Sequence, residues 1–286
     1  MSSLKIRKPS VAGMFYPADI DTLTTSINEY MNLAEDKTNP DKIVRGIVSP
    51  HAGYVYSGPV AGWSFKQVLG KSYDIVIVIS PSHLEAFRGC SIYSGDAYRT
   101  PLGEVLADKE LCRKISDNGK MIEISDAGHQ LSGWGQGEHA LEVQLPFLQV
   151  ALKNEFKIVP IVMGQQMPDV MEDLAAALAH SLKDKNFLIV ASSDLSHYHP
   201  YDEAKAMDKS IVDFFDEFND SEIMDGVATN SIEACGGGPI VSMMKTLKQM
   251  GTAEATSLYY ATSGDVPVGE KDQVVGYMSG MISMLK

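Results

Sequence analysis

Cysteine is scarce in this sequence, and its copies are spread widely along the chain. Cys90, Cys112 and Cys235 are the only three among 286 residues, and no two of them form a CxxC pair. An odd number of widely spaced cysteines without a CxxC pair argues against both a disulfide framework and a structural zinc knuckle. A reducing compartment fits this composition best.

Basic residues and long apolar runs are also in short supply. The chain has 24 Lys and Arg against 37 Asp and Glu, for a net charge of -13. Nucleic acids and anionic membranes are bound largely through Lys and Arg, so neither is an expected partner. No apolar run approaches the ~20 residues that span a bilayer. The apolar stretch between Pro9 and Pro17 is too short for a signal peptide, so we expect a soluble, cytoplasmic protein.

The chain does have enough apolar residues, 44%, to bury a substantial core. Short, continuously apolar runs alternate with longer amphipathic segments, as in strands that helices cover on both faces. This alternation predicts one α/β domain over residues 1–286, with a central, mostly parallel or mixed β-sheet flanked by helices. The expected strands are 42–49, 74–80, 156–164 and 187–193, with two further strands, antiparallel additions to the sheet, at 256–264 and 274–282; the expected helices are 23–31, 59–69, 138–152, 168–183, 202–217 and 239–250.

Three of the predicted strands end in histidine or aspartate. His51 follows "GIVSP", His83 follows "VISPS", and Asp194 and His197 lie in "LIVASSDLSHYH". In open α/β sheets, ligands bind beyond the carboxyl ends of the strands, where loops converge. Three such loops therefore predict a functional site, although a single histidine would be read as structural. We further expect Asp194 to pair with His197 and to fix the tautomer of its imidazole.

Cys235 lies in "EACGGGPI", just before a helix that Pro239 is well suited to begin. The positive end of a helix lowers the pKa of a nearby thiol and favours the thiolate, which binds metals or attacks electrophiles. The alternative is a small buried side chain beside a turn, which is our interpretation of Cys90 and Cys112.

His139 lies at the start of "EHALEVQLPFLQVAL", whose leucines share one helical face. The segment looks mainly like a packed helix, with His139 as a candidate to line the site. No role follows for His129, His180 or His199.

Six motifs together resemble the Memo family, whose members share a fold with LigB-type class III extradiol dioxygenases. The matches span nearly the whole chain, from about Pro9 to the final strand. In order, they are "PSVAGMFYPAD", "SPHAGYVYSGPVA", "SPSH", "GEHALEVQLPFL", "SSDLSHY" and "CGGGPI".

The resemblance implies a LigB-like cleft with assigned residue roles. In the dioxygenases, two histidines and a glutamate hold non-haem Fe(II), and a further histidine is the acid/base. By motif position, His51 and His83 match the histidine ligands, Cys235 takes the place of the carboxylate, and His197, with Asp194, matches the acid/base. The aromatic walls of the cleft would be Phe15 and Tyr56. A thiolate is softer than a carboxylate and favours copper and zinc, so dioxygenase activity does not follow from the fold.

Three functions remain open at this point. The first is a metal-dependent oxidoreductase with Fe(II) or Cu at His51, His83 and Cys235. The second is a binding module that holds a peptide or a phosphorylated or acidic ligand in the same cleft. The third is a zinc hydrolase. The family resemblance implies a small-molecule or peptide ligand and, for microbial relatives, radical-SAM-associated partner proteins.

Overall fold

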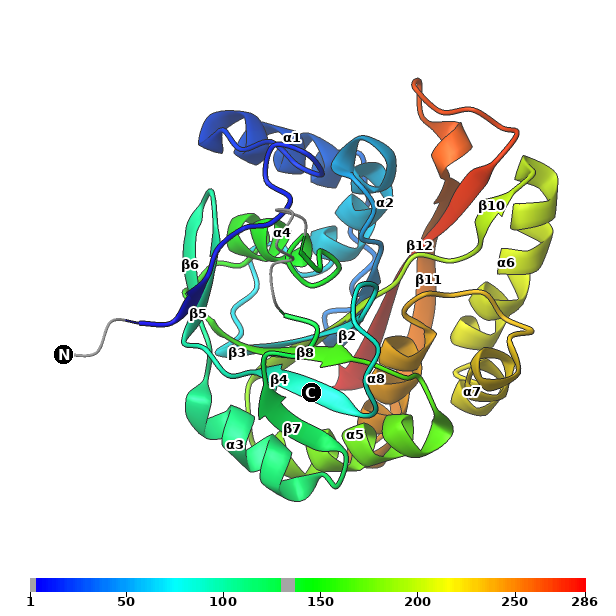
Figure 1. Ribbon diagram of the computed structural model, residues 1–286. Helices are drawn as coiled ribbons and strands as arrows, with labels where there is room; N and C mark the ends of the chain where they lie inside the picture. Colours follow the sequence, from blue (N-terminus) through cyan, green and yellow to red (C-terminus); the bar gives the residue numbers. More distant parts are fainter. Residues whose placement is uncertain (1–3, 130–136) are drawn as a thin grey trace.

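A nine-stranded mixed β-sheet forms the centre of the molecule (Figure 1). The computed structural model describes residues 4–129 and 137–286. The strand order is β10-β12-β2-β9-β3-β8-β4-β7, and β11 pairs with β12. The central strands β2, β9, β3 and β8 run parallel, whereas β12 is antiparallel to β2. The strands are β2 (Lys42–Ser49), β3 (Ile75–Pro81), β4 (Cys90–Tyr93), β7 (Ile122–Ser125), β8 (Lys157–Met163), β9 (Phe187–Ser192), β10 (His197–His199), β11 (Ala253–Thr262) and β12 (Val274–Leu285).

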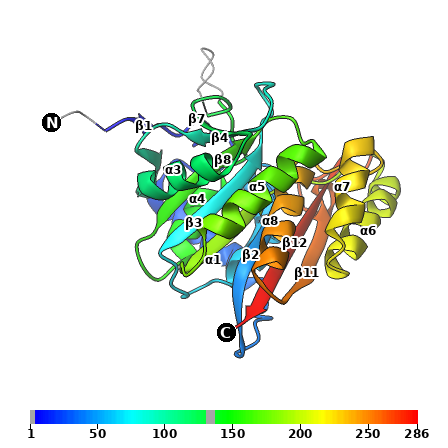
Figure 2. The same cartoon turned by 90° about the horizontal axis from the view of Figure 1, so that it is seen from below.

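Helices cover both faces of this sheet. Figure 2 shows α3, α5, α8, α7 and α6 on one face, while α1, α2 and α4 pack on the other, beside a small sheet of β1 (Ile6–Arg7), β5 (Ala97–Thr100) and β6 (Gly103–Leu106). The single-domain α/β prediction is therefore confirmed. The helices are α1 (Ile20–Asn32), α2 (Tyr54–Lys66), α3 (Lys109–Asn118), α4 (Gln144–Ala151), α5 (Pro168–Ser181), α6 (Tyr201–Asp216), α7 (Asp220–Thr229) and α8 (Gly237–Met250).

The continuously apolar strands occupy the positions that the sequence predicts. In β3, Ile77 and Ile79 contribute to the core beneath α5 and α8, and Val76 and Val78 to the core beneath α2 and α4. Successive side chains of a strand point to opposite faces, so a strand covered on both faces has to be apolar at every position. The predicted antiparallel additions are also confirmed, as β11 and β12.

The starts of α2 and α4 differ most from the prediction. The segment before Pro59 reads as a turn, but α2 already begins at Tyr54. Pro59 therefore lies inside the helix, where it has no amide hydrogen to donate to the carbonyl of Val55. Helix α4 begins at Gln144 instead of 138. The carboxylate of Glu138 accepts hydrogen bonds from the amides of His139 and Ala140, which holds this segment in turns.

Strand β11 lies at an edge of the sheet, paired only with β12 in the described chain. Its pairing is interrupted by a register shift between Ser257 and Tyr259. At the same place, the carboxylate of Asp216 on α6 accepts hydrogen bonds from the amide and the hydroxyl of Ser257. The edge is thus bulged and partly capped. Of the helices in the described ranges, none has both the length and the apolar character needed to cross a bilayer.

Candidate metal centre

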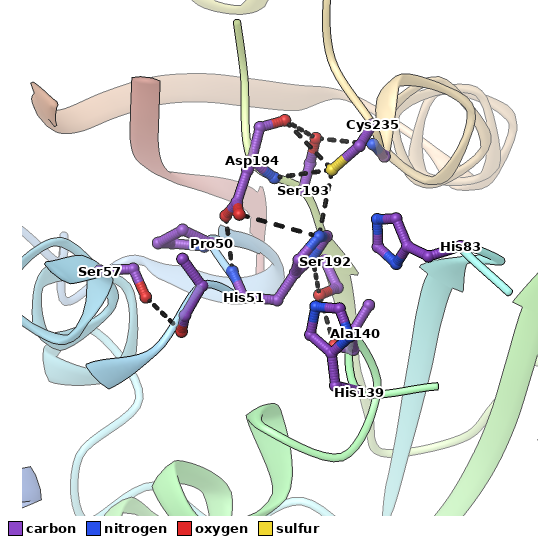
Figure 3. Close-up of polar contacts among 12 residues, drawn as sticks. Pro50, His51, Ser57, His83, His139, Ala140, Ser192, Ser193, Asp194 and Cys235 are labelled. Atoms are coloured by element: carbon purple, nitrogen blue, oxygen red, sulfur yellow. Dashed lines mark hydrogen bonds and ion pairs between the residues drawn. The ribbon is translucent and has the colours of Figure 1, made fainter. Parts of the chain in front are cut away.

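Three side chains from distant parts of the chain meet beyond the carboxyl ends of the parallel strands (Figure 3). His51 follows β2, His83 follows β3, and Cys235 precedes α8. One potential ligand atom from each lies within 4.8 Å of the others. The structure thus brings together the three metal ligands that the sequence predicts.

The hydrogen bonds around His51 fix its tautomer. The hydroxyl of Ser192 donates to the carbonyl of Ala140 (2.7 Å) and accepts from Nε2 of Gln144 (2.8 Å). With its proton committed, the hydroxyl accepts from Nδ1–H of His51, 2.8 Å away. The lone pair of His51 therefore lies on Nε2, which faces Sγ of Cys235 at 3.1 Å. Such a second hydrogen bond is how proteins orient histidine ligands of metals.

His83 is oriented in the same way by a buried carboxylate. Its Nδ1 lies 3.0 Å from Oε1 of Glu138. The other oxygen of this carboxylate, Oε2, accepts a hydrogen bond from the backbone amide of His83. Burial alone would raise the pKa of Glu138, but the hydrogen bond and charge of His83 lower it to about 2. Burial alone would lower the pKa of His83, but the hydrogen bond and charge of Glu138 outweigh burial and raise this pKa. The pairing leaves Nε2 of His83 available as a ligand atom.

A second group, of His83, Glu138 and His139, also has potential ligand atoms within 4.8 Å of one another. The hydrogen bond between His83 and Glu138 already occupies two of these groups. We therefore interpret Glu138 as the partner that orients His83, as carboxylates do beside metal-bound histidines.

His139 and Phe15 form one side of this cluster. The ring of His139 stacks on that of His83 with centroids 5.0 Å apart, and the ring of Phe15 lies 4.6 Å from His139. Burial lowers the pKa of His139 to about 4, so its imidazole is neutral near pH 7. Tyr56 lies in the first turn of α2 with 38% of its surface exposed. Ligand contacts of Phe15, Tyr56 and His139 remain predictions.

Asp194 connects His51 to Cys235 instead of pairing with His197. Its Oδ1 accepts the backbone amide of His51 at 2.7 Å, and its own amide donates to Sγ of Cys235 at 3.3 Å. Nδ1–H of His197 donates to the carbonyl of Leu195 at 2.7 Å. The predicted Asp194–His197 pair is therefore wrong, because the loop after β9 turns the carboxylate toward β2. Burial raises the pKa of Asp194 to about 7, although the amide of His51 opposes the shift.

The expected lowering of the Cys235 pKa is also wrong. Burial raises the pKa of this thiol well above its ordinary value, and the charge of Asp194 adds to the increase. The amide of Asp194 acts in the opposite direction but is outweighed. Removal from water is therefore the largest influence on the pKa of this thiol.

His197 occupies a strained turn. The next residue, Tyr198, has a left-handed backbone (φ 64°) and is 69% exposed. Such a conformation costs of order 1 kcal/mol or more outside glycine. The buried carboxylate of Asp208 holds this turn through the amide of Ser196. Burial lowers the pKa of His197, so its imidazole is neutral near pH 7 with Nε2 free to accept a proton.

Gln166 is a site residue that the sequence analysis misses. Its Nε2 donates to the carbonyl of Cys235, and its Oε1 accepts the amide of Gly238, both at 2.6 Å. Its side chain thus holds the start of α8 against the loop after β8. Gln166 follows a predicted strand, so the strand-end rule that selects His51 and His83 could have found it.

Arg7 and Glu142 form a buried ion pair behind the cluster. Arg7 Nη1 lies 2.7 Å from Glu142, and the two side chains are only 3% and 0% exposed. Glu142 also accepts hydrogen bonds from the amides of Ser10 and Val11 and from the hydroxyl of Tyr16. Arg7 also donates to the carbonyl of Glu138. The pair ties the N-terminal segment to the loop that orients His83, and no local sequence pattern predicts it.

Ser192→Ala tests the orienting hydrogen bond of His51. The substitution should lower the affinity for Zn(II) and Cu(I) about 10- to 100-fold, the usual cost of losing an outer partner of a metal-binding histidine. Competition titrations with chromophoric chelators would measure it. Ser242→Ala, at an equally buried serine in α8, is the control and should bind as the wild type does. If Ser192→Ala bound both metals as tightly as Ser242→Ala, the tautomer assigned to His51 would be contradicted.

Comparison with known proteins shows that the chain is similar to members of one family along almost its whole length. The Memo-like protein family model matches residues 7–281. A MEMO1 family protein of Nitrosopumilus maritimus is 36% identical over 278 residues, which cover 95% of this chain and 98% of the relative. Another from Methanocaldococcus jannaschii is 36% identical over 293 residues, covering 97% and 99%. A third, from Methanosarcina mazei, is 36% identical over 276 residues, covering 96% and 98%.

Proposed function

The chain belongs to the Memo-like family, and we propose that it is a metal-dependent oxidoreductase whose metal is held by His51, His83 and Cys235. The observation that carries the proposal is the convergence of two imidazole nitrogens and one thiol sulfur within 4.8 Å. The orientation of both imidazoles supports it, because Ser192 and Glu138 bind Nδ1 and leave Nε2 as the donor atom.

The donor set suits iron or copper, with zinc as the third candidate. Imidazole binds all three metals, while a thiolate shifts the preference from iron toward copper and zinc. A bound iron or copper ion would supply a one-electron redox centre and a Lewis acid.

The surrounding residues have distinct parts in this proposal. His197, hydrogen-bonded through Nδ1–H, would accept a proton at Nε2 and could then return that proton. Asp194 would fix the backbone of His51 and the sulfur of Cys235 relative to each other, through the two hydrogen bonds described above. Phe15 and His139 would provide an aromatic wall next to His83.

A non-catalytic binding module is the second candidate, and one observation favours it. The thiol of Cys235 can donate to Nε2 of His51 at 3.1 Å, which satisfies both groups without an ion. In that case the cleft would hold a ligand by hydrogen bonds alone. Metal analysis of protein purified without chelator or nickel resin separates the candidates. Stoichiometric iron or copper supports the oxidoreductase, zinc supports a hydrolase, and persistently metal-free protein supports the binding module.

Substitutions at Cys235 test the ligand set directly. Cys235→Ser should weaken Cu(I) and Zn(II) binding by more than about 100-fold, because a neutral hydroxyl is a poor replacement for a thiolate. Cys235→Glu should restore a set of two histidines and one carboxylate, and shift the preference toward Fe(II). Anaerobic titrations of the wild type and both variants with each metal would measure these changes. Cys112→Ser, at a thiol buried away from the cluster, is the control. Identical affinities in wild type and both Cys235 variants would exclude the sulfur as a ligand.

A further inference from the structure

A cavity of about 1140 Å³ opens beside Cys235 and His197. Four segments line it: the connection between β3 and β4 at Arg88, the loop between β8 and α5 with the start of α5, the start of the His197 turn, and the end of α7 with the connection to α8. Phe15, Tyr56 and His139 are not among the described residues that line it. The volume is slightly above the range of small-molecule sites, which enclose roughly 300–1,000 Å³. The cavity is therefore large enough to hold a ligand in reach of the thiol.

The charges on its wall disfavour an anion. The only Lys or Arg side chain among its lining residues is Arg88, and its guanidinium lies 2.8 Å from the carboxylate of Asp169, which also lines the cavity. Glu233 contributes a second carboxylate, 2.9 Å from Nε2 of His199. With a net charge of -13 on the whole chain, an anionic ligand would meet repulsion both at long range and at the wall.

The rest of the wall combines apolar and amide groups. Met167, which is 49% exposed, lies at the start of α5, and Val227 and Ile232 lie on the α7 side. The amide of Gln166 is already committed to Cys235 and Gly238. Polar and apolar groups thus share this wall, and it suits a small organic ligand that has both an apolar part and hydrogen-bonding groups.

We infer that this cavity is the ligand-binding site of the Cys235 cluster, and that its ligand is uncharged or cationic with an apolar body. The ligand enters between the β8–α5 loop and α7, and reaches Cys235 and His197 together. Any reaction of the ligand at Cys235 and His197 rests on the proposed function. The route by which the ligand enters and the charge that the cavity prefers do not depend on that function.

The route can be tested on the metal-free, full-length protein with two thiol reagents of opposite charge. Methanethiosulfonates that carry a trimethylammonium group or a sulfonate group react with a thiolate in the same way and differ in charge. The thiolate attacks the sulfenyl sulfur, a disulfide forms, and methanesulfinate leaves. Cys90 and Cys112 are 3% and 1% exposed, so Cys235 is the expected target, and Cys235→Ser should abolish the modification. Because burial raises the pKa of this thiol, the rates are compared at a weakly alkaline pH, where more of the thiolate forms. The cationic reagent should react about tenfold faster than the anionic one.

Substitutions at the cavity separate a local effect from the charge of the whole protein. Glu233→Gln should reduce the cation preference severalfold, and Glu155→Gln, at an exposed carboxylate before β8, should leave it unchanged. Both should be measured at about 0.15 M salt, where distant surface charges are screened. Equal effects of the two variants would show that net charge alone sets the preference, and would overturn the inference about the ligand's charge.

Substitutions that fill the cavity test whether the reagents reach Cys235 through it. Ala228→Trp, at an exposed position on α7, should slow both reagents by more than about tenfold. Met167→Trp fills the cavity from the β8–α5 loop and provides an independent variant if the first does not fold. Val55→Trp, next to Tyr56, is the control for the aromatic side and should have no effect. If Val55→Trp slowed the modification of Cys235 and the two cavity variants did not, the proposed route through the cavity would be overturned. Because no metal is present, failure of the proposed function would not alter these rates.

Discussion

Replacing His83 with alanine is expected to lower the affinity for Cu(I), Zn(II) and Fe(II) by more than about 100-fold, because the loss of a direct ligand exceeds the 10- to 100-fold cost of losing an outer partner. The fold should persist, since the side chain of His83 is 29% exposed and contributes little to the core. Anaerobic metal titrations and thermal unfolding of the same samples would measure both quantities.

His51→Ala should lose metal binding to the same extent but also unfold more easily. His51 is only 2% exposed, so its removal leaves a cavity and takes away one of the three hydrogen-bond partners of the Ser192 hydroxyl. His180→Ala, at an exposed position of α5, is the matched control for both variants. Wild-type affinity in His83→Ala with an intact fold would exclude His83 as a ligand and leave the binding module as the better interpretation.

Glu142→Gln is expected to lower the free energy of unfolding by about 3–5 kcal/mol, as breaking one side of a buried ion pair does elsewhere. The carboxylate accepts four hydrogen bonds, and its loss leaves the guanidinium of Arg7 buried without a counter-ion. This cost is a large fraction of the 5–15 kcal/mol that typically stabilises a domain. Urea unfolding, followed by circular dichroism, would measure it.

Two further variants distinguish the buried pair from an ordinary surface one. Glu254→Gln, which breaks an ion pair between Lys42 and a 64% exposed Glu254, should change stability by less than about 1 kcal/mol. Arg7→Met combined with Glu142→Leu should recover part of the loss, because neither charge is then left unpaired. A Glu142→Gln protein as stable as Glu254→Gln would contradict the role of the pair.

The sheet and the strand-end residues could be predicted from sequence because each depends on local pattern. A continuously apolar run such as 74–80 specifies a doubly covered strand, and the chemistry of His51 and His83 is placed by where the strands end. Motif resemblance added Cys235, which the pattern alone left open between ligand and packing residue.

The partners of these residues could not be predicted, because they come from distant segments. Ser192 lies 141 residues from His51, and Glu138 lies 55 from His83. The Asp194–His197 prediction failed for a related reason: proximity in sequence suggested a pair, whereas the fold gave the carboxylate a closer partner across the sheet. The raised pKa of Cys235 likewise reflects three-dimensional burial that sequence position near a helix does not reveal.

The bulged and capped edge at β11 has a consequence for how the protein behaves at high concentration. A long edge strand with free amides and carbonyls is a template on which another molecule can add a strand, and repetition of that step leads to aggregates. In β11 the amide of Ser257 is already bonded to Asp216, and the register shift next to it breaks the regular ladder that an incoming strand would need. The regular ladder that a second chain would need is therefore interrupted at this point, which disfavours edge-to-edge polymerisation of the folded protein.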